Sequence, residues 1–97
     1  MSSSKNSRQP LIVTTAHRGV FFGYGLPTSE NTIRLTDARM CVYWSTDVRG
    51  VLGLASRGPS KQCRIGPAVP GITLRDVTSV MEVSEEAEEA WKKEPWA

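Results

Sequence analysis

Short runs of β-branched and aromatic residues, separated by glycine, proline and small polar residues, dominate the first two thirds of the chain. Such runs are typical of β-strands, and the residues between them are typical of tight turns. Residues 11–15 and 19–24 are the first two expected strands, followed by a turn-rich segment at residues 25–31. In residues 32–36 apolar and polar positions alternate strictly, which predicts a third strand with one buried face.

Residues 38–44 carry apolar side chains at both alternating sets of positions. Strands of this kind are usually covered on both faces, so we expect a central strand here, entered through a bend at Asp37. Further along, residues 63–65 predict a short strand. Residues 72–83 are rich in β-formers, but their alternation changes parity, which predicts either one bent strand or two short strands with a break near residues 75–76.

The segment between these strands, residues 47–57, has the signals of a short helix. Asp47 can accept hydrogen bonds from the first-turn amides, Gly58 suits the left-handed position after the last turn, and Pro59 prevents continuation. We expect a buried stripe made of the apolar side chains of this segment, namely Val51, Leu52, Leu54 and Ala55.

A second helix is expected in residues 84–94. Ser84 can cap its start, glutamates fill its first turn, lysines fill its last turn, and Pro95 ends it. This helix would pack on its own domain or on a neighbouring subunit, and in the second case Trp91 and Trp96 would be interface anchors.

Together these elements predict a mainly β, α+β fold. It would be a small, strongly bent antiparallel sheet or barrel with a mid-chain helix and a C-terminal helix. The 97 residues allow one domain, with residues 1–9 as a flexible arm and residues 10–83 as the β-rich body. No apolar run approaches the roughly 20 residues of a membrane span, so we expect no membrane partner. Self-association would help so small a chain to bury apolar surface.

Formal charge is distributed unevenly along the chain. Residues 1–81 contain ten basic and four acidic residues, a net charge of +6, whereas residues 82–97 contain two basic and six acidic residues, a net charge of −4. The body therefore favours anionic partners, and its arginine-rich composition suits phosphate or carboxylate groups.

Cationic and aromatic residues gather around the mid-chain helix. Charges beside flat rings are what a nucleotide requires, since the phosphate pairs with the cations and the base stacks on the rings. The candidate ligand-binding residues are Arg18, Tyr43, Trp44, Arg49, Arg57 and Lys61. A phosphate-binding loop at residues 53–60 is rejected, because Pro59 replaces the expected lysine and the segment ends a helix instead of starting one.

Catalytic and metal-binding patterns are weak. His17 has no partner at a diagnostic spacing, and no paired histidines or carboxylates suggest hydrolysis. Cys41 and Cys63 lack metal-ligand spacing and are interpreted as buried reduced thiols, although a single disulfide between them stays possible. We therefore expect no enzymatic activity, no cofactor and no metal.

Four segments resemble a family of small proteins carried by tailed bacteriophages: RGV at residues 18–20, DARMCVYW at 37–44, RGVLGLASRGP at 49–59 and TLRDVTSV at 73–80. The resemblance covers residues 11–91 and implies a protein that acts in the cytoplasm of an infected bacterial host. Small phage proteins include inhibitors of host defence, some of which are oligomers that sequester cyclic-nucleotide signals. Separately, the pattern GVFFGY…TIRLTDA is similar to the bent second and third strands of Sm-like barrels, which is a likeness of fold only.

Three functions are compatible with these features. The first is a non-enzymatic, homo-oligomeric binding protein that sequesters a small anionic nucleotide-type ligand, such as a host immune signal. The second is a nucleic-acid-binding barrel that uses an outward stripe of Arg34, Arg39 and Arg75. The third is a protein inhibitor of a host defence factor that binds through Trp91 and Trp96. The cation and aromatic pattern favours the first.

Overall fold

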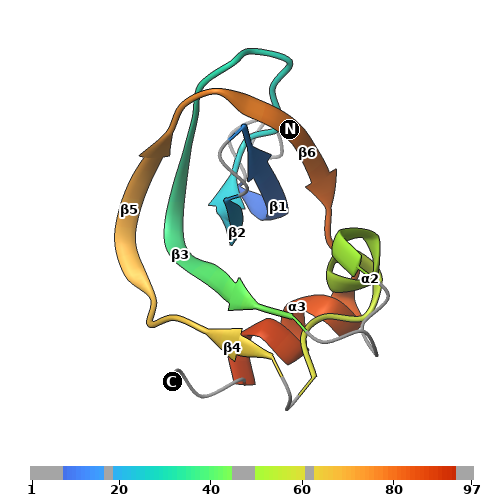
Figure 1. Cartoon of the computed structure of the whole chain (residues 1–97). Coiled ribbons are helices and arrows are strands. Elements are labelled where there is room, and N and C mark those ends of the chain that lie inside the picture. Colours follow the sequence, from blue (N-terminus) through green and yellow to red (C-terminus); the bar gives the residue numbers. More distant parts are fainter. Residues whose placement is uncertain (1–7, 17–18, 45–49, 61–62, 94–97) are drawn as a thin grey trace, which may run out of the picture.

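The computed structural model describes residues 8–16, 19–44, 50–60 and 63–93 (Figure 1). Within these ranges it has six strands and two helices, in the order β1 (Gln9–Thr15), β2 (Val20–Gly25), β3 (Ile33–Tyr43), α2 (Gly50–Ser56), β4 (Arg64–Ile65), β5 (Val69–Leu74), β6 (Val77–Glu82) and α3 (Glu85–Lys93). The expectation of a mainly β, α+β fold with a mid-chain and a C-terminal helix is confirmed. Neither helix is long and apolar enough to cross a membrane.

All strand pairs are antiparallel, and the sheet bends strongly. Its order is β4-β3-β2-β1-β6, and β5 pairs with the first half of β3. The consecutive strands β5 and β6 therefore pair with different partners, β3 and β1, and only two residues join them. Figure 1 shows β5 and β6 arching around β1 and β2, which brings both ends of the sheet around a common interior.

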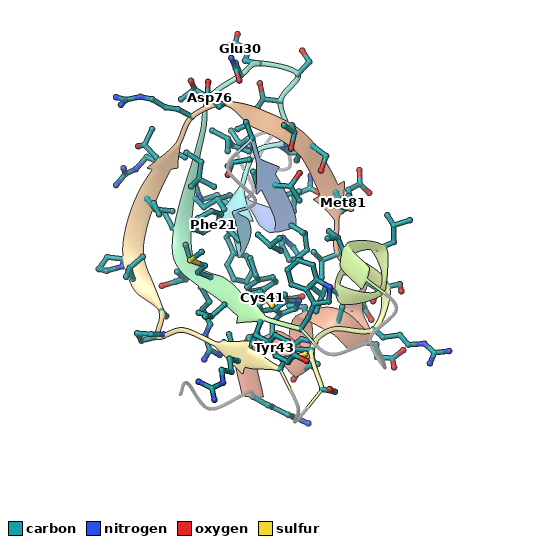
Figure 2. All side chains as sticks on the ribbon, viewed as in Figure 1. Phe21, Glu30, Cys41, Tyr43, Asp76 and Met81 are labelled. Carbon is teal, nitrogen blue, oxygen red and sulfur yellow. The ribbon has the colours of Figure 1, made fainter. Side chains whose placement is uncertain are left out.

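Two aspartates in left-handed conformations make the sharpest changes of direction. Asp37 has a φ of 48° and Asp76 a φ of 57°, a region in which aspartate is tolerated better than most residues. The expected strands at residues 32–36 and 38–44 are in fact one long strand, β3, with the expected bend at Asp37. Asp76 provides the break near residues 75–76, at the turn from β5 to β6 (Figure 2), so two short strands form instead of one bent strand.

The strand covered on both faces is β1, not residues 38–44 as expected. Leu11, Ile12 and Val13 are each 0% exposed, and they contribute to two different core clusters. In the second half of β3 only one face is covered: Met40 is 42% exposed and Val42 is 62% exposed. The helices lie on the opposite face of this part of β3. Met40 pairs with Phe21, which pairs with Val13, so Met40 faces the same side as Val13. The pairing of β5 with β3 ends at Ala38, which leaves Met40 and Val42 uncovered.

The apolar interior consists of two clusters on the two sides of β1. One lies within the bend of the sheet and consists of Leu11, Val13, Ile33, Leu35, Ala38 and Leu74. The other lies between the sheet and the helices and includes Ile12, Phe22, Cys41, Leu54, Ile65 and Trp91. Because the second cluster joins the sheet to α2 and α3, the position of both helices depends on it.

The end of α2 follows the expected capping pattern. The amides of Arg57 and Gly58 both donate to the carbonyl of Gly53, at 2.8 and 3.2 Å, and Gly58 has a φ of 88°. Leu54 is buried as expected, but Leu52 is 73% exposed, so its inclusion in the buried stripe was wrong. Seven residues of helix cannot turn both faces inward, and α2 rests on the side that carries Leu54. Asp47 lies outside the described residues.

Ser84 caps α3 as expected and also ties it to α2. Its Oγ accepts a 3.1 Å hydrogen bond from the amide of Ala87 and donates a 2.6 Å hydrogen bond to the carbonyl of Ser56. Its own amide donates to the carbonyl of Ala55 at 3.0 Å. The start of α3 and the end of α2 are therefore held by one residue. Ala87 and Trp91, each 0% exposed, pack α3 on its own domain.

Candidate functional site

Only half of the expected ligand-binding residues lie in the described part of the chain. Arg18, Arg49 and Lys61 lie outside it. Tyr43, at the end of β3, is 53% exposed, and Arg57, directly after α2, is also exposed. Trp44 is partly buried and packs against the core cluster beneath the helices. The three described residues do not line the hollow that follows.

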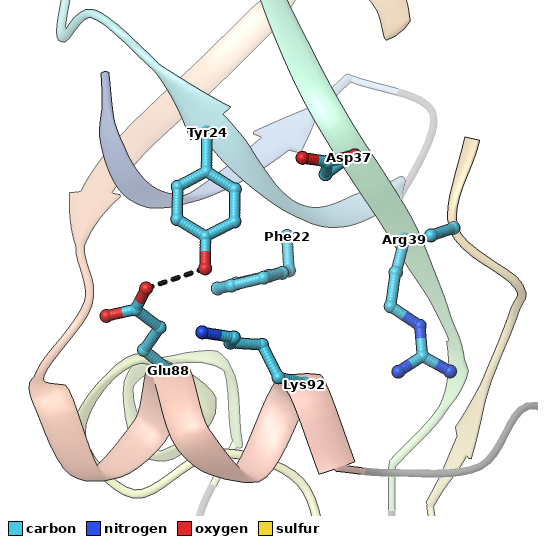
Figure 3. A pocket seen from close by; sticks show the side chains of 7 residues that line it. Phe22, Tyr24, Asp37, Arg39, Glu88 and Lys92 are labelled. Carbon is cyan, nitrogen blue, oxygen red and sulfur yellow. Dashed lines mark hydrogen bonds between the residues drawn. The ribbon is translucent and has the colours of Figure 1, made fainter. Parts of the chain in front are cut away.

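A hollow of about 610 Å³ opens between the bent sheet and α3. Its lining combines aromatic, acidic and basic side chains from three elements and one connection, namely Phe22, Tyr24, Asp37, Arg39, Ala68, Glu88 and Lys92. Figure 3 shows the side chains of β2 pointing towards those of α3, with β3 closing one side. This volume lies in the usual range of small-molecule sites, roughly 300–1,000 Å³.

The aromatic wall of the hollow is set by strand alternation and by ring packing. Phe22 and Tyr24 are two residues apart on β2, so they share one face, and their ring centroids are 5.5 Å apart at an interplanar angle of 77°. Phe22 stacks on Trp91 at 5.0 Å and 6°. The Trp91 indole is in turn fixed by a 3.1 Å hydrogen bond from its Nε1 to the carbonyl of Leu54. The wall is therefore rigid on the side of the core.

On the opposite wall, the charged side chains follow helical spacing. Glu88 and Lys92 are four residues apart on α3 and project from the same face (Figure 3). The Tyr24 hydroxyl donates a 2.6 Å hydrogen bond to Oε2 of Glu88. Burial, together with the Glu88 carboxylate, raises the pKa of Tyr24 well above its usual range. At neutral pH this phenol is therefore a hydrogen-bond donor that holds Glu88 in place.

Arg39 is a structural member of the lining. Its side chain is 8% exposed, and it donates from Nε to the carbonyl of Gly66 at 2.8 Å and from Nη1 to the carbonyl of Trp91 at 2.7 Å. It thereby joins the last turn of α3 to the connection between β4 and β5. Its expected place in an outward stripe for nucleic acid is wrong, because the side chain is buried. The other members, Arg34 and Arg75, are exposed.

Asp37 completes the charged lining from the bend of β3, where its carboxylate is exposed. The two acidic side chains, Asp37 and Glu88, balance the two basic ones, Arg39 and Lys92. The hollow is therefore formally neutral, unlike the cationic cluster expected from the sequence. It can hydrogen-bond amino groups and an anion at the same time.

The two cysteines are buried free thiols. Burial, with a smaller contribution from neighbouring Cys63, raises the pKa of Cys41 to about 12. At neutral pH Cys41 is therefore protonated, which is the unreactive form. Within the described ranges, no group of three or more histidine, cysteine, aspartate or glutamate side chains is placed to hold a metal ion.

Trp91 is not the interface anchor that the sequence predicted. Trp91 is 0% exposed and packs in the core of its own chain, so it is a core residue and offers no surface to a partner. Its position on the apolar stripe of an amphipathic helix explains this, since α3 buries that stripe on its own sheet. Trp96 lies outside the described residues.

None of the residues that line the hollow was predicted to bind the small ligand, and only Arg39 was given a binding role, in the stripe for nucleic acid. A local signal existed for each wall: the two-residue spacing of Phe22 and Tyr24, and the four-residue spacing of Glu88 and Lys92. Nothing in the sequence, however, shows that these two walls face each other, because 64 positions separate Tyr24 from Glu88.

Comparison with known proteins gives a family but no described activity. No curated protein and no solved structure matches the chain. One family model, described as a domain of unknown function (DUF6948), matches residues 8–91. The match extends from the residue before β1 to the buried Trp91 of α3. Of the residues that line the hollow, all but Lys92 lie within it. The chain belongs to the DUF6948 family.

Proposed function

We propose that this protein is a non-enzymatic binding protein that sequesters a small nucleotide-type ligand in the hollow beneath α3. The observation that carries the proposal is the composition of that hollow, in which an aromatic wall faces a carboxylate and an ammonium group on one helix. Sites for small molecules commonly combine an apolar or aromatic surface with a few fixed polar groups. Tyr24 and Glu88, joined at 2.6 Å, supply such a fixed group.

The balanced charge of the lining limits the ligand. In this proposal the base lies against the aromatic wall and donates its amino groups to Asp37 or Glu88, because carboxylates accept hydrogen bonds from base edges. A phosphate pairs with Lys92. A formally neutral hollow favours a ligand with one phosphate per base over a highly charged polyphosphate. The exposed positions of Asp37 and Lys92 leave both groups accessible from solvent.

The proposed biological role follows from the resemblance to small phage proteins. The ligand would be a host signalling nucleotide, and the protein would lower its free concentration in the cytoplasm of an infected bacterium. In the hollow, the raised pKa of Tyr24 keeps its phenol protonated and hydrogen-bonded to Glu88, which suits a binding role.

The nucleic-acid alternative receives less support from the same residues. Arg39, one of the three arginines of the proposed nucleic-acid stripe, is buried, and exposed glutamates lie on the outward side of α3. A long polyanion would meet this acidic helix beside the hollow, which opposes binding.

Isothermal titration calorimetry and thermal shift with a panel of nucleosides, nucleoside monophosphates and cyclic mono- and dinucleotides test the proposal. At least one phosphorylated member should bind, and Lys92→Ala should weaken its binding by at least about tenfold, since a charge-assisted hydrogen bond contributes about 1.5–3 kcal/mol. Lys93→Ala is the matched control, because the neighbouring Lys93 is exposed and does not line the hollow. If no member binds, or if both variants bind equally, this site is refuted.

A further inference from the structure

We propose that copies of this chain associate head to tail, with Leu52 of one copy seated in an apolar groove between β3 and β5 of the next copy. The groove has a volume of about 340 Å³ and is separate from the ligand hollow, with which it shares only Arg39. Its lining is almost entirely apolar and includes Phe21, Met40, Val42, Pro67, Val69 and Ile72. This inference does not depend on the proposed ligand.

The groove presents three large apolar side chains that the sheet leaves in solvent. Met40 is 42% exposed, Val42 is 62% exposed and Val69 is 40% exposed. Single exposed apolar residues are common, but several that line one depression are typical of a binding surface. Phe21, Ala38 and Ile72 of this groove also contact the cluster within the bend of the sheet, so the groove is an open edge of that cluster that a second apolar group would stabilise.

The same chain carries a side chain suited to such a groove. Leu52 is 73% exposed, more than any other large apolar residue in the described part of the chain. It projects from α2, and Figure 1 shows α2 and β5 on opposite sides of the molecule. Leu52 therefore cannot reach the groove of its own copy, but it can reach that of a neighbour.

Charged residues also differ between the side of the molecule that carries Leu52 and the side that carries the groove. Next to α2, the end of β6 and the first turn of α3 carry the exposed acidic residues Glu82, Glu85 and Glu86, and in the described part of the chain Arg57 is their basic neighbour. On the groove side, β4 and its connection to β5, residues 64–68, contain the exposed Arg64 and no acidic residue. When Leu52 of one copy approaches the groove of another, the acidic side chains beside α2 can therefore meet Arg64, which favours this orientation over groove against groove.

Contacts between two different surfaces have a geometric consequence. Each copy keeps one unused surface after pairing, so association continues until a ring closes or a filament grows. A copy with a damaged groove still offers its Leu52, and a copy with a changed Leu52 still offers its groove. Two such variants should therefore form a one-to-one pair that cannot extend.

Sedimentation velocity and native mass spectrometry of the full chain test this arrangement. Wild type should form species larger than a dimer, whereas Leu52→Glu and Val42→Glu should each be monomeric alone and should form a heterodimer when mixed. Both positions are exposed, so both variants should keep the wild-type circular dichroism spectrum. Leu26→Glu is the control, since Leu26 is 44% exposed in the β2–β3 loop and should leave assembly unchanged.

The proposal is overturned if wild type stays monomeric at protein concentrations up to about 1 mM, because a dissociation constant above this value corresponds to a very weak contact. It is also overturned if either variant assembles like wild type, or if the mixed variants remain monomeric. Ligand binding by a monomeric variant would leave the proposed function intact, so the two proposals fail separately.

Discussion

The hydroxyl of Tyr24 donates a 2.6 Å hydrogen bond to the carboxylate of Glu88, so a side chain of β2 holds a side chain of α3 across the hollow. The bond is partly buried, and it lies beside the stacked rings of Phe22 and Trp91. One polar contact and one ring stack thus fix the distance between the sheet and the helix.

Removal of this hydroxyl should destabilise the fold. Tyr24→Phe leaves the Glu88 carboxylate without its donor, and the free energy of unfolding should fall by about 1–3 kcal/mol, the range for a partly buried hydrogen bond to a charged group. Urea denaturation followed by circular dichroism measures the change. Tyr43→Phe, at a position that is 53% exposed, should change the free energy by less than about 0.5 kcal/mol. Equal effects at the two positions would contradict a structural role for the bond.

Alkaline pH should destabilise the protein through Cys41. Burial raises the pKa of this thiol from 9.0 to about 12, so the folded state favours the protonated form. Below pH 9 the thiol is protonated in both states and this contribution is complete. As pH rises towards 12, only the unfolded state loses the proton, and the free energy of unfolding falls.

The measurement is urea denaturation at several pH values between 8 and 11. Cys41→Ala should show a shallower decline than wild type above pH 9. Tyr24, whose pKa is also raised, contributes a decline of the same sign above pH 10, so Tyr24→Phe should remove a separate part of the slope. A Cys41→Ala profile parallel to that of wild type would show that the thiol ionises equally in both states.

Gly58 should tolerate no side chain. Its φ is 88°, and an added Cβ would lie 2.6 Å from the Cβ of Ala90 and 2.9 Å from the carbonyl oxygen of Ala87, where α2 meets α3. Gly58→Ala should therefore cost about 2–4 kcal/mol from backbone strain and steric overlap combined. Gly50→Ala is a matched control, since Gly50 has a φ of 78° but nothing within 4 Å, and it should cost only about 1–2 kcal/mol. Thermal unfolding of both variants gives the difference, and identical losses would show that the helix contact is loose.

Arg39 should be essential for the position of α3, although it is charged. Arg39→Met removes the donors to the carbonyls of Gly66 and Trp91, and it should lower the free energy of unfolding by about 2–4 kcal/mol. Arg34→Met removes an exposed guanidinium that donates to Thr73, and it should cost less than about 1 kcal/mol. Hydrogen exchange of the α3 amides should increase in the first variant only. Unchanged exchange would assign the helix position to apolar packing alone.

Local patterns in the sequence predicted the elements better than they predicted which faces are covered. The capping residues Ser84 and Gly58 act over three or four positions, so their signals can be recognised without knowledge of the fold. Burial of Leu11, Ile12 and Val13 on both sides of β1 depends instead on where the rest of the sheet and the helices pack. Residues 38–44 also carry apolar side chains at both sets of positions, but no described element covers the face of Met40 and Val42.

The candidate site was harder to predict for the same reason. Tyr43 and Trp44 are conspicuous in the sequence because they are adjacent aromatics near arginines, yet they take no part in the hollow. Tyr24 and Glu88 are ordinary in their local contexts and become a pair only when β2 and α3 meet. Proximity along the chain was informative for caps and turns, and uninformative for a cavity built from distant segments.

The pairing of β1 with β6 has a consequence for synthesis on the ribosome. Leu11 lies opposite Glu82, so the first strand obtains its second neighbour only after residue 82 has been made. The walls of the hollow likewise come from distant segments, Phe22 early and Lys92 late. A nascent chain should therefore gain neither its closed sheet nor any capacity to retain a ligand until α3 has left the ribosome, and closure over such sequence separations should be slow.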